Sequence, residues 1–174
     1  MTPAGRKFML ALHLTVSVGW IGAVLAYLAL GVAASISENP QTVRGAWIAM
    51  ELTGWYVIVP SAVASLLTGV AMALGTRWGL FRHYWVLFSL VLTFVATAVL
   101  VLRMPTVSSR ADIARQADDA GVLGLGGDLA HPGIGLAVLV VVLVLNVYKP
   151  RGVTGFGARK LHEQRRTRPV SSAP

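Results

Sequence analysis

The chain of 174 residues contains no cysteine and only seven acidic residues. Without a thiol it can form no disulfide, hold no thiolate-bound metal and use no cysteine nucleophile. Charged residues make up 13% of the chain and hydrophobic residues 55%, and the mean hydropathy is +0.68. This balance favours a multispanning membrane protein over a soluble one.

Sequence patterns typical of catalysis and of nucleotide binding are also missing. There is no nucleophile–base pair and no cluster of carboxylates within the apolar segments, so no reaction step can be assigned. Residues 121–128 are rich in glycine, but they lack the Lys-Ser or Lys-Thr ending of a phosphate-binding loop. The net charge of +8 comes from basic residues that flank the apolar segments instead of lining a soluble face with aromatic residues. We therefore expect no nucleic-acid partner.

The first apolar segment covers residues 8–35 and carries no formal charge, with one histidine, His13, near its start. A helix needs about 20 apolar residues to cross a bilayer, so this segment can span with tilt or overhang. A cleaved signal peptide is the alternative, because Arg6 and Lys7 precede the segment and residues 32–34 would pass as a cleavage site. Signal peptides have an apolar region of about 7–15 residues, which favours a retained first helix.

Three further apolar segments predict three more spans, at residues 55–75, 84–102 and 133–148. Pro40 suits the first turn of a helix, and the amphipathic stretch 43–54 either lies at the membrane interface or extends the second span outward. Pro60 would kink the second span if its helix begins before residue 55.

The loop after the third span is the longest polar segment before the C-terminal tail. Arg103, Met104 and Pro105 are expected to end the third helix, residues 108–120 to form a short amphipathic helix, and residues 121–128 to form a loop. The predicted fold is therefore all-α: a four-helix transmembrane bundle over residues 1–150, with that short helix in its outer third loop. Residues 151–174 are expected to form a basic, mostly disordered cytoplasmic tail.

The basic residues predict the orientation. With four spans, both termini and the middle turn share one side, which carries 11 of the 15 lysine and arginine residues. The other side carries four, Arg44, Arg103, Arg110 and Arg115. The positive-inside rule then predicts a multi-pass protein of the bacterial cytoplasmic (inner) membrane with both termini in the cytoplasm. The basic cluster after the last span is expected to attract anionic lipid headgroups.

Histidines in the predicted spans are the candidate cofactor ligands. One face of the first helix carries His13 together with Met9, Ser17, Trp20, Val24 and Tyr27. That face would suit a planar cofactor such as haem b, with His13 as an axial ligand and His83 as the second choice. The alternatives are that His13 hydrogen-bonds a neighbouring helix or transfers protons, and that His83 faces lipid headgroups. The opposite face, with Gly19 and Gly22 among its small residues, would suit close helix packing.

Two further groups of residues are candidates for packing or binding. A stripe of small residues on the second span, Ser61, Ser65, Gly69 and Ala73, would pack inside the bundle or form a homodimer face. Glu51, Arg103 and His131 would meet as an outer polar cluster that holds the loops down or admits a metal or a proton. One carboxylate and one imidazole are too few ligands to predict a metal.

Three short blocks of the chain stand out together: His13 with residues 19–22, residues 78–86 around the middle turn, and residues 147–152 after the last span. Over residues 10–160 they resemble a bacterial family of small predicted integral membrane proteins with a domain of unknown function. Members of that family often have lysine at the position of Ser89. Its loss here weakens any mechanism that needs a cation midway along the third span.

The spacing of His13, Trp20 and Gly22 is also similar to the first helix of the copper-resistance D membrane domain and of HemJ-type protoporphyrinogen oxidases. In the latter group a histidine on the first helix is implicated in haem binding, and His13 is the matching position. The leading hypothesis is therefore a cofactor-binding or redox-associated membrane protein. The alternative is a non-catalytic accessory or small transport subunit of a membrane complex.

Overall fold

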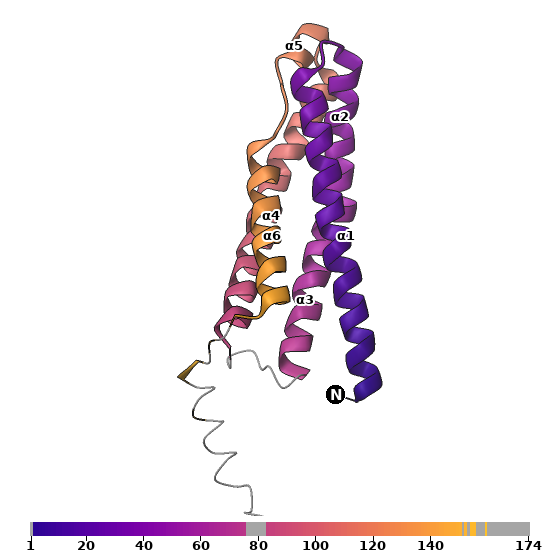
Figure 1. Ribbon diagram of the computed structural model, residues 1–174. Coiled ribbons are helices and arrows are strands. Elements are labelled where there is room, and N and C mark those ends of the chain that lie inside the picture. The colour runs from indigo at the N-terminus through magenta and orange to yellow at the C-terminus, as the bar shows by residue number, and fades with distance from the viewer. Residues whose placement is uncertain (1, 76–82, 151, 153, 156–158, 160–174) are drawn as a thin grey trace, which may run out of the picture.

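The computed structural model describes residues 2–75 and 83–150, together with residues 152, 154, 155 and 159. The chain is an all-α four-helix bundle, as the sequence predicts, and four of its helical segments are long and apolar enough to cross a membrane (Figure 1). Most of the predicted tail, 151–174, and most of the middle turn lie outside the described residues.

The first helix, α1 (Pro3–Ile36), confirms the first predicted span and exceeds it at both ends. Its start is capped because the Thr2 side chain accepts a hydrogen bond from the Gly5 amide at 3.2 Å, and Pro3 fills the first helical position. At 1.5 Å per residue the helix is about 51 Å long, whereas the hydrocarbon core of a bilayer is about 30 Å thick. Part of α1 therefore extends beyond any membrane that it spans.

The second span is one continuous helical rod made of α2 (Pro40–Thr53), the π-helical segment η1 (Gly54–Ile58) and α3 (Val59–Gly75). The amphipathic stretch thus extends the second span. The π-helical turn precedes Pro60, which has no N–H for the ladder and whose ring crowds the preceding turn. Gly54 lies against α4, where a Cβ would be 2.5 Å from Cε of Met104.

The predicted end of the third helix at residues 103–105 is wrong, because α4 (Tyr84–Gln116) continues through Pro105. Proline removes one backbone hydrogen bond, but the side chains on both sides of it, Met104 and Val107, are buried against the other helices. Tertiary packing therefore overrides the local helix-breaking signal.

As a consequence, most of the short helix predicted at residues 108–120 is the end of α4. A separate short helix, α5 (Asp119–Leu123), follows it. Its start is capped by Asp118, whose carboxylate accepts a hydrogen bond from the Gly121 amide at 2.9 Å.

The last helix, α6 (Ala130–Tyr148), confirms the fourth predicted span. Around the bundle α1 packs against α3 and α6, and α4 packs against the same two helices. The start of α1 and the end of α6 lie at one end of the bundle, and α5 lies at the other (Figure 1). We call the first of these the terminal end.

The α5 end holds the largest fully buried side chains of the described residues, those of Trp47, Met50, Met104, Val43 and Val122. Here α4 runs about 20 Å past the start of α6, because its 33 residues are 14 more than the 19 of α6. We call this region the head: the end of α1 from Gly31, α2, the end of α4 from Met104, α5 and residues 124–129. Its core includes Met50, Ala111, Ala114 and Val122, all with 0% exposure.

Candidate functional site

Among the described residues, two cavities of the bundle differ in size and chemistry. The polar cavity, of about 70 Å³, lies toward the terminal end and is lined by residues of all four long helices. The apolar cavity, of about 320 Å³, lies next to the head between α1, α4 and α6. Of the predicted ligand and polar-cluster residues, His13 lines the first cavity and Arg103 and His131 line the second, whereas His83 and Glu51 line neither.

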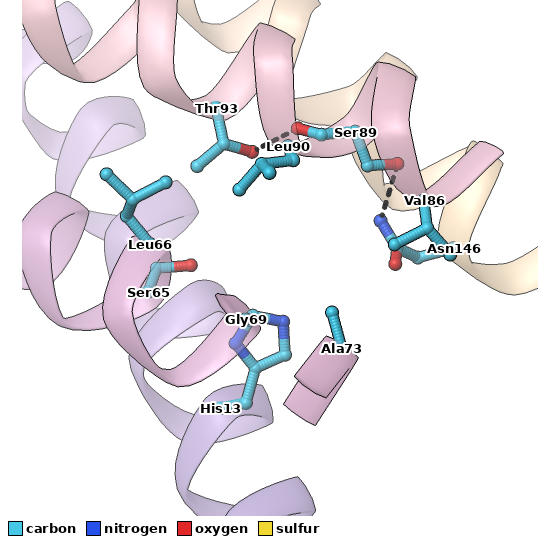
Figure 2. Close-up of a pocket in the computed structure, with 10 residues that line it drawn as sticks. All are labelled: His13, Ser65, Leu66, Gly69, Ala73, Val86, Ser89, Leu90, Thr93 and Asn146. Atoms are coloured by element: carbon cyan, nitrogen blue, oxygen red, sulfur yellow. Dashed lines mark hydrogen bonds between the residues drawn. The ribbon is translucent and has the colours of Figure 1, made fainter. Parts of the chain in front are cut away.

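His13 projects from α1 toward the polar cavity, with its ring turned toward the space between the other labelled residues (Figure 2). Its Nδ1 lies 2.9 Å from Oγ1 of Thr68 on α3. Oγ1 of Thr68 is also 2.7 Å from the Ala64 carbonyl, so its single proton is donated within its own helix. Thr68 must then accept from Nδ1–H of His13, which leaves Nε2 of the neutral ring with its lone pair.

Hydrogen bonds between helices surround this histidine. Ser17 and Ser65 join α1 to α3 through their hydroxyls at 2.8 Å. On the other side, Nδ2 of Asn146 on α6 donates to the Ser89 hydroxyl on α4 at 3.2 Å (Figure 2). Each of the four long helices thus contributes a polar side chain to this level of the bundle. Such contacts join helices in lipid, where apolar side chains provide no hydrophobic driving force between them.

The polar cavity does not fit haem. Cofactor and ligand pockets usually measure about 300–1,000 Å³, and this cavity is about 70 Å³ with His13 as the one imidazole in its lining. The described residues contain no group of three or more His, Asp or Glu side chains that could hold a metal ion. The space is large enough for several water molecules, each of which needs about 10–15 Å³.

His83 lies elsewhere. It precedes the first turn of α4, and its ring packs edge-on against Trp85 with ring centroids 6.4 Å apart. His83 does not line the cavity that contains His13, so the structure does not bring the two predicted ligands together around one site.

The small-residue stripe of α3 faces the inside of the bundle. Ser65 and Ala73 are buried, Ser61 is half-buried, and a Cβ on Gly69 would lie 3.3 Å from Cε1 of His13. The small face of α1 behaves differently. Gly19 and Gly22 are exposed, and a Cβ on either would meet no atom of the described chain within 4 Å. The close packing expected for that face is therefore absent within this chain's described residues.

The apolar cavity has hydrocarbon walls and a polar end. Most of its walls come from three helices, and one residue, Ile58, comes from η1. The main lining residues are Trp20, Val24 and Tyr27 on α1, Leu92, Ala96, Val99 and Leu100 on α4, and Ile134, Gly135, Val138 and Leu139 on α6. Val99 and Ile134 are exposed as well as lining the cavity, so it opens sideways between α4 and α6. The polar end contains Arg103, Asp128 and His131.

These three polar residues form a compact group. Nδ1 of His131 is 3.2 Å from Oδ1 of Asp128 and 3.3 Å from Nη2 of Arg103. Nδ1 can either donate to Asp128 or accept from Arg103, but not both. A hydrogen bond to the carboxylate favours the tautomer that carries the proton on Nδ1 and a lone pair on Nε2. Arg103 forms an ion pair with Asp128 at 3.9 Å. Its Nε is buried and has no hydrogen-bond partner among the described residues.

The predicted outer cluster of Glu51, Arg103 and His131 is thus only partly assembled. Arg103 and His131 meet, but Glu51 forms an ion pair with Arg115 in the head. Asp128 takes the place expected for Glu51. Sequence reasoning assigned Asp128 to the loop, although its position three residues before His131, at the start of a helix, was a usable signal.

The loop that carries Asp128 is held by backbone contacts. A Cβ on Gly31 of α1 would lie 2.6 Å from the Asp128 carbonyl oxygen, so only glycine permits this approach. Gly126 has a positive φ of 58°, and its carbonyl accepts a hydrogen bond from Nε1 of Trp47 at 2.9 Å. Arg110 donates to the Leu125 carbonyl at 3.1 Å. The head therefore positions the carboxylate at the end of the apolar cavity.

No protein-family model, no curated protein and no solved structure matches this chain. What the protein binds has to be inferred from the chemistry of its two cavities.

Proposed function

We propose that this protein is an integral membrane protein that binds a lipid-soluble amphiphile in the apolar cavity. The four long apolar helices are compatible with membrane insertion. The body of the ligand would lie between α1, α4 and α6, and its polar head would lie at Arg103 and His131. Ligand sites are typically apolar spaces with a few well-placed polar groups, which is the composition of this cavity.

The observation that carries the proposal is the apolar cavity of about 320 Å³ with Arg103, Asp128 and His131 at one end. Its other walls are almost all apolar. The side chains of Arg103 and His131 are 37% and 47% exposed, so they can hydrogen-bond a polar ligand head. A ligand made of hydrocarbon alone would offer these groups no partner.

The position of the polar end along the bundle axis supports the binding of an amphiphile. Arg103 is 19 residues after the start of α4 at Tyr84, which corresponds to about 28 Å along the helix. This matches the thickness of the hydrocarbon core, about 30 Å. The apolar walls would then lie within the acyl chains, and Arg103 and His131 would lie at the level of the headgroups. If the termini are cytoplasmic, as the basic residues predict, the site belongs to the outer leaflet.

Tryptophan fluorescence tests this proposal, because Trp20 lines the cavity and is 4% exposed. The protein would be placed in nanodiscs whose lipid tails carry bromine, which quenches tryptophan on contact. The contribution of Trp20 is the difference between the wild type and Trp20→Phe. We expect this contribution to be quenched, because a lipid tail enters the cavity.

Two glycines of α6 provide matched variants. A Cβ on Gly135 or on Gly133 would meet no atom of the described chain within 4 Å, but only Gly135 lines the apolar cavity. Gly135→Leu should fill the cavity and protect Trp20, and Gly133→Leu should leave the quenching unchanged. Equal quenching of Trp20 in the two variants, or no quenching in the wild type, would contradict the proposal.

A further inference from the structure

We infer that the polar cavity is a proton-binding site: a water-filled space, open toward the terminal end, in which Nε2 of His13 accepts a proton. The site is separate from the apolar cavity, and the inference does not depend on the amphiphile. Three features of the described residues carry it. They are the depth of the cavity, the hydrogen-bonding groups that line it, and the tautomer of His13 that its neighbours fix.

The polar cavity reaches from the terminal end to about the middle of the hydrocarbon core. Its lining begins at Ala73, Val86 and Asn146, each two residues from the end of its helix, or about 3 Å of helix rise. Its deepest lining residue on α4, Thr93, is nine residues from Tyr84, or about 14 Å. Half of a hydrocarbon core is about 15 Å. Water on the terminal side therefore has a short path to the cavity.

Beyond the polar cavity the interior of the bundle is apolar. Between Thr93 and Arg103, the α4 residues that line the other cavity are Val95, Ala96, Val99 and Leu100. Apolar spaces stay dry, because a water molecule needs two to four polar partners. A proton bound at the level of Thr93 would therefore return to the side from which it came instead of crossing the membrane.

The polar side chains that line the cavity offer more acceptors than donors. The Asn146 amide uses both its protons, toward the Ser89 hydroxyl at 3.2 Å and a carbonyl of its own helix at 2.8 Å, so its Oδ1 is left to accept. The Thr93 hydroxyl donates to the Ser89 carbonyl at 2.7 Å. At most the hydroxyl protons of Ser89 and of the Ser17–Ser65 pair remain for donation. This lining suits water and protonated species and offers no cation to an anion.

One nitrogen of His13 is available to take up a proton. Nδ1 already carries one, because Thr68 donates its own proton to the Ala64 carbonyl and must accept from Nδ1–H. Nε2 is on the side of the ring toward Ala73 and Asn146 (Figure 2), and it is not among the buried polar atoms that lack a partner. Hydronium would transfer its proton to the Nε2 lone pair and become water, and Nδ1–H would stay in place. The new N–H can donate to water that Oδ1 of Asn146 also holds.

His13 is the one residue of this lining whose charge can change, since Asp, Glu, Lys, Arg and Tyr are absent from it. Helix α3 carries no ionisable residue. An ionisable side chain at membrane depth is costly, and such residues typically face water-filled cavities and belong to proton or ion pathways. On the other three helices the nearest described ionisable residues lie closer to the terminal end and outside the lining: Arg6, Lys7, His83, Tyr84, Tyr148 and Lys149.

¹⁵N NMR of histidine-labelled protein in nanodiscs tests the proton uptake. The signals of His13 are the difference between the wild type and His13→Gln, whose fold is checked by circular dichroism. Over about pH 8 to 5, where histidine usually titrates, we expect Nε2 to become protonated as the pH falls while Nδ1 stays protonated. An Nε2 that stays unprotonated over this range, or an Nδ1 that loses its proton at the upper end, would overturn the inference.

Single engineered cysteines test the water and its side of entry, because the chain has no cysteine of its own. Ser65 lines the polar cavity, whereas Ser61, one turn away on the same helix, lines neither cavity. In oriented proteoliposomes a cationic methanethiosulfonate should modify Ser65→Cys at least about tenfold faster than Ser61→Cys, because the reactive thiolate is suppressed in apolar surroundings. The reagent should act from the terminal side alone. Equal rates for the two variants, or modification from the opposite side, would show that the cavity is not a water-filled space open to the terminal end.

Discussion

The head and the terminal end of the bundle are packed by different forces. In the head, α2 and the end of α4 bury apolar side chains completely, with Met50 and Ala111 at 0% exposure. Toward the terminal end the helices meet through hydroxyl, imidazole and amide groups around the polar cavity. The last helix has only 6% of its most apolar window buried in the bundle, against 22–28% in the other three segments.

This difference has a simple physical reason. In the proposed placement the helices of the head project past the bilayer and face water, so burial of apolar surface would stabilise the head as it does a soluble protein. Within the bilayer, lipid tails are as apolar as leucine, and helices associate through close packing and interhelical hydrogen bonds. The variants below test this contrast, in order of decreasing expected effect.

The largest effect is expected from Trp47→Ala in the core of the head. Trp47 is 1% exposed and donates to the Gly126 carbonyl. Its truncation should lower the free energy of unfolding by about 3–5 kcal/mol, since a buried tryptophan leaves a large cavity. Denaturant unfolding followed by circular dichroism measures this. Trp55→Ala is the control, because Trp55 is 39% exposed. Equal destabilisation by the two variants would show that the site of Trp47 is no more tightly packed than the exposed site of Trp55.

A smaller loss is expected from Gly31→Ala, which acts where the head meets the apolar cavity. The added methyl would push the loop away from α1 at the Asp128 carbonyl. We expect a loss of about 1–3 kcal/mol of stability, as for overpacking elsewhere, together with weaker quenching of Trp20 in the nanodisc assay. Gly22→Ala is the matched control, since a Cβ there meets open space. Unchanged quenching in Gly31→Ala would show that the loop does not shape the site.

At the terminal end, Thr68→Val removes the acceptor for Nδ1–H of His13. Interhelical hydrogen bonds in membranes are worth about 0.6–2 kcal/mol, so the stability loss should be in that range. The sharper measurement is ¹⁵N NMR of the imidazole, which should show the loss of a fixed Nδ1–H tautomer. Thr97→Val is the control, because the Thr97 hydroxyl bonds within its own helix, to the Thr93 carbonyl. A tautomer mixture already present in the wild type would contradict the assignment.

The smallest effect is expected from Glu51→Gln, on the surface of the head. Glu51 pairs with Arg115, which is 39% exposed and also bonds Asp112 at 2.7 Å. Exposed ion pairs contribute about 0.2–1 kcal/mol and are screened by salt. Unfolding measured at low and at high salt should therefore show a difference between wild type and variant that shrinks as salt rises. A difference independent of salt would argue that Glu51 has a role other than this ion pair.

Several local features could be read from the sequence because their causes are local. Pro40 begins α2, as the sequence predicts, because proline suits the first turn of a helix. The face of α1 that carries His13 and Trp20 follows from the period of 3.6 residues. His13 accordingly faces the interior, and Trp20 is buried.

Other features depended on contacts between residues far apart in the chain. The continuation of α4 through Pro105 is one, because packing against α2 outweighs a local helix breaker. The partner of Arg103 is another. A loop residue, Asp128, reaches it only because Gly31 and Gly127 let two backbones approach closely. Glu51 and Arg115 are 64 residues apart, and no periodicity could have paired them.

The sequence by itself determined that this is a bundle of four long apolar helices, because length, hydropathy and caps act within each segment. Only the tertiary structure decided that His13 shares a small polar cavity with Asn146 instead of a large one with His83. It also decided that Arg103, Asp128 and His131 close the end of an apolar cavity. Cavities arise where helices fail to fill the space between them, and that depends on crossing and register, which no single segment encodes.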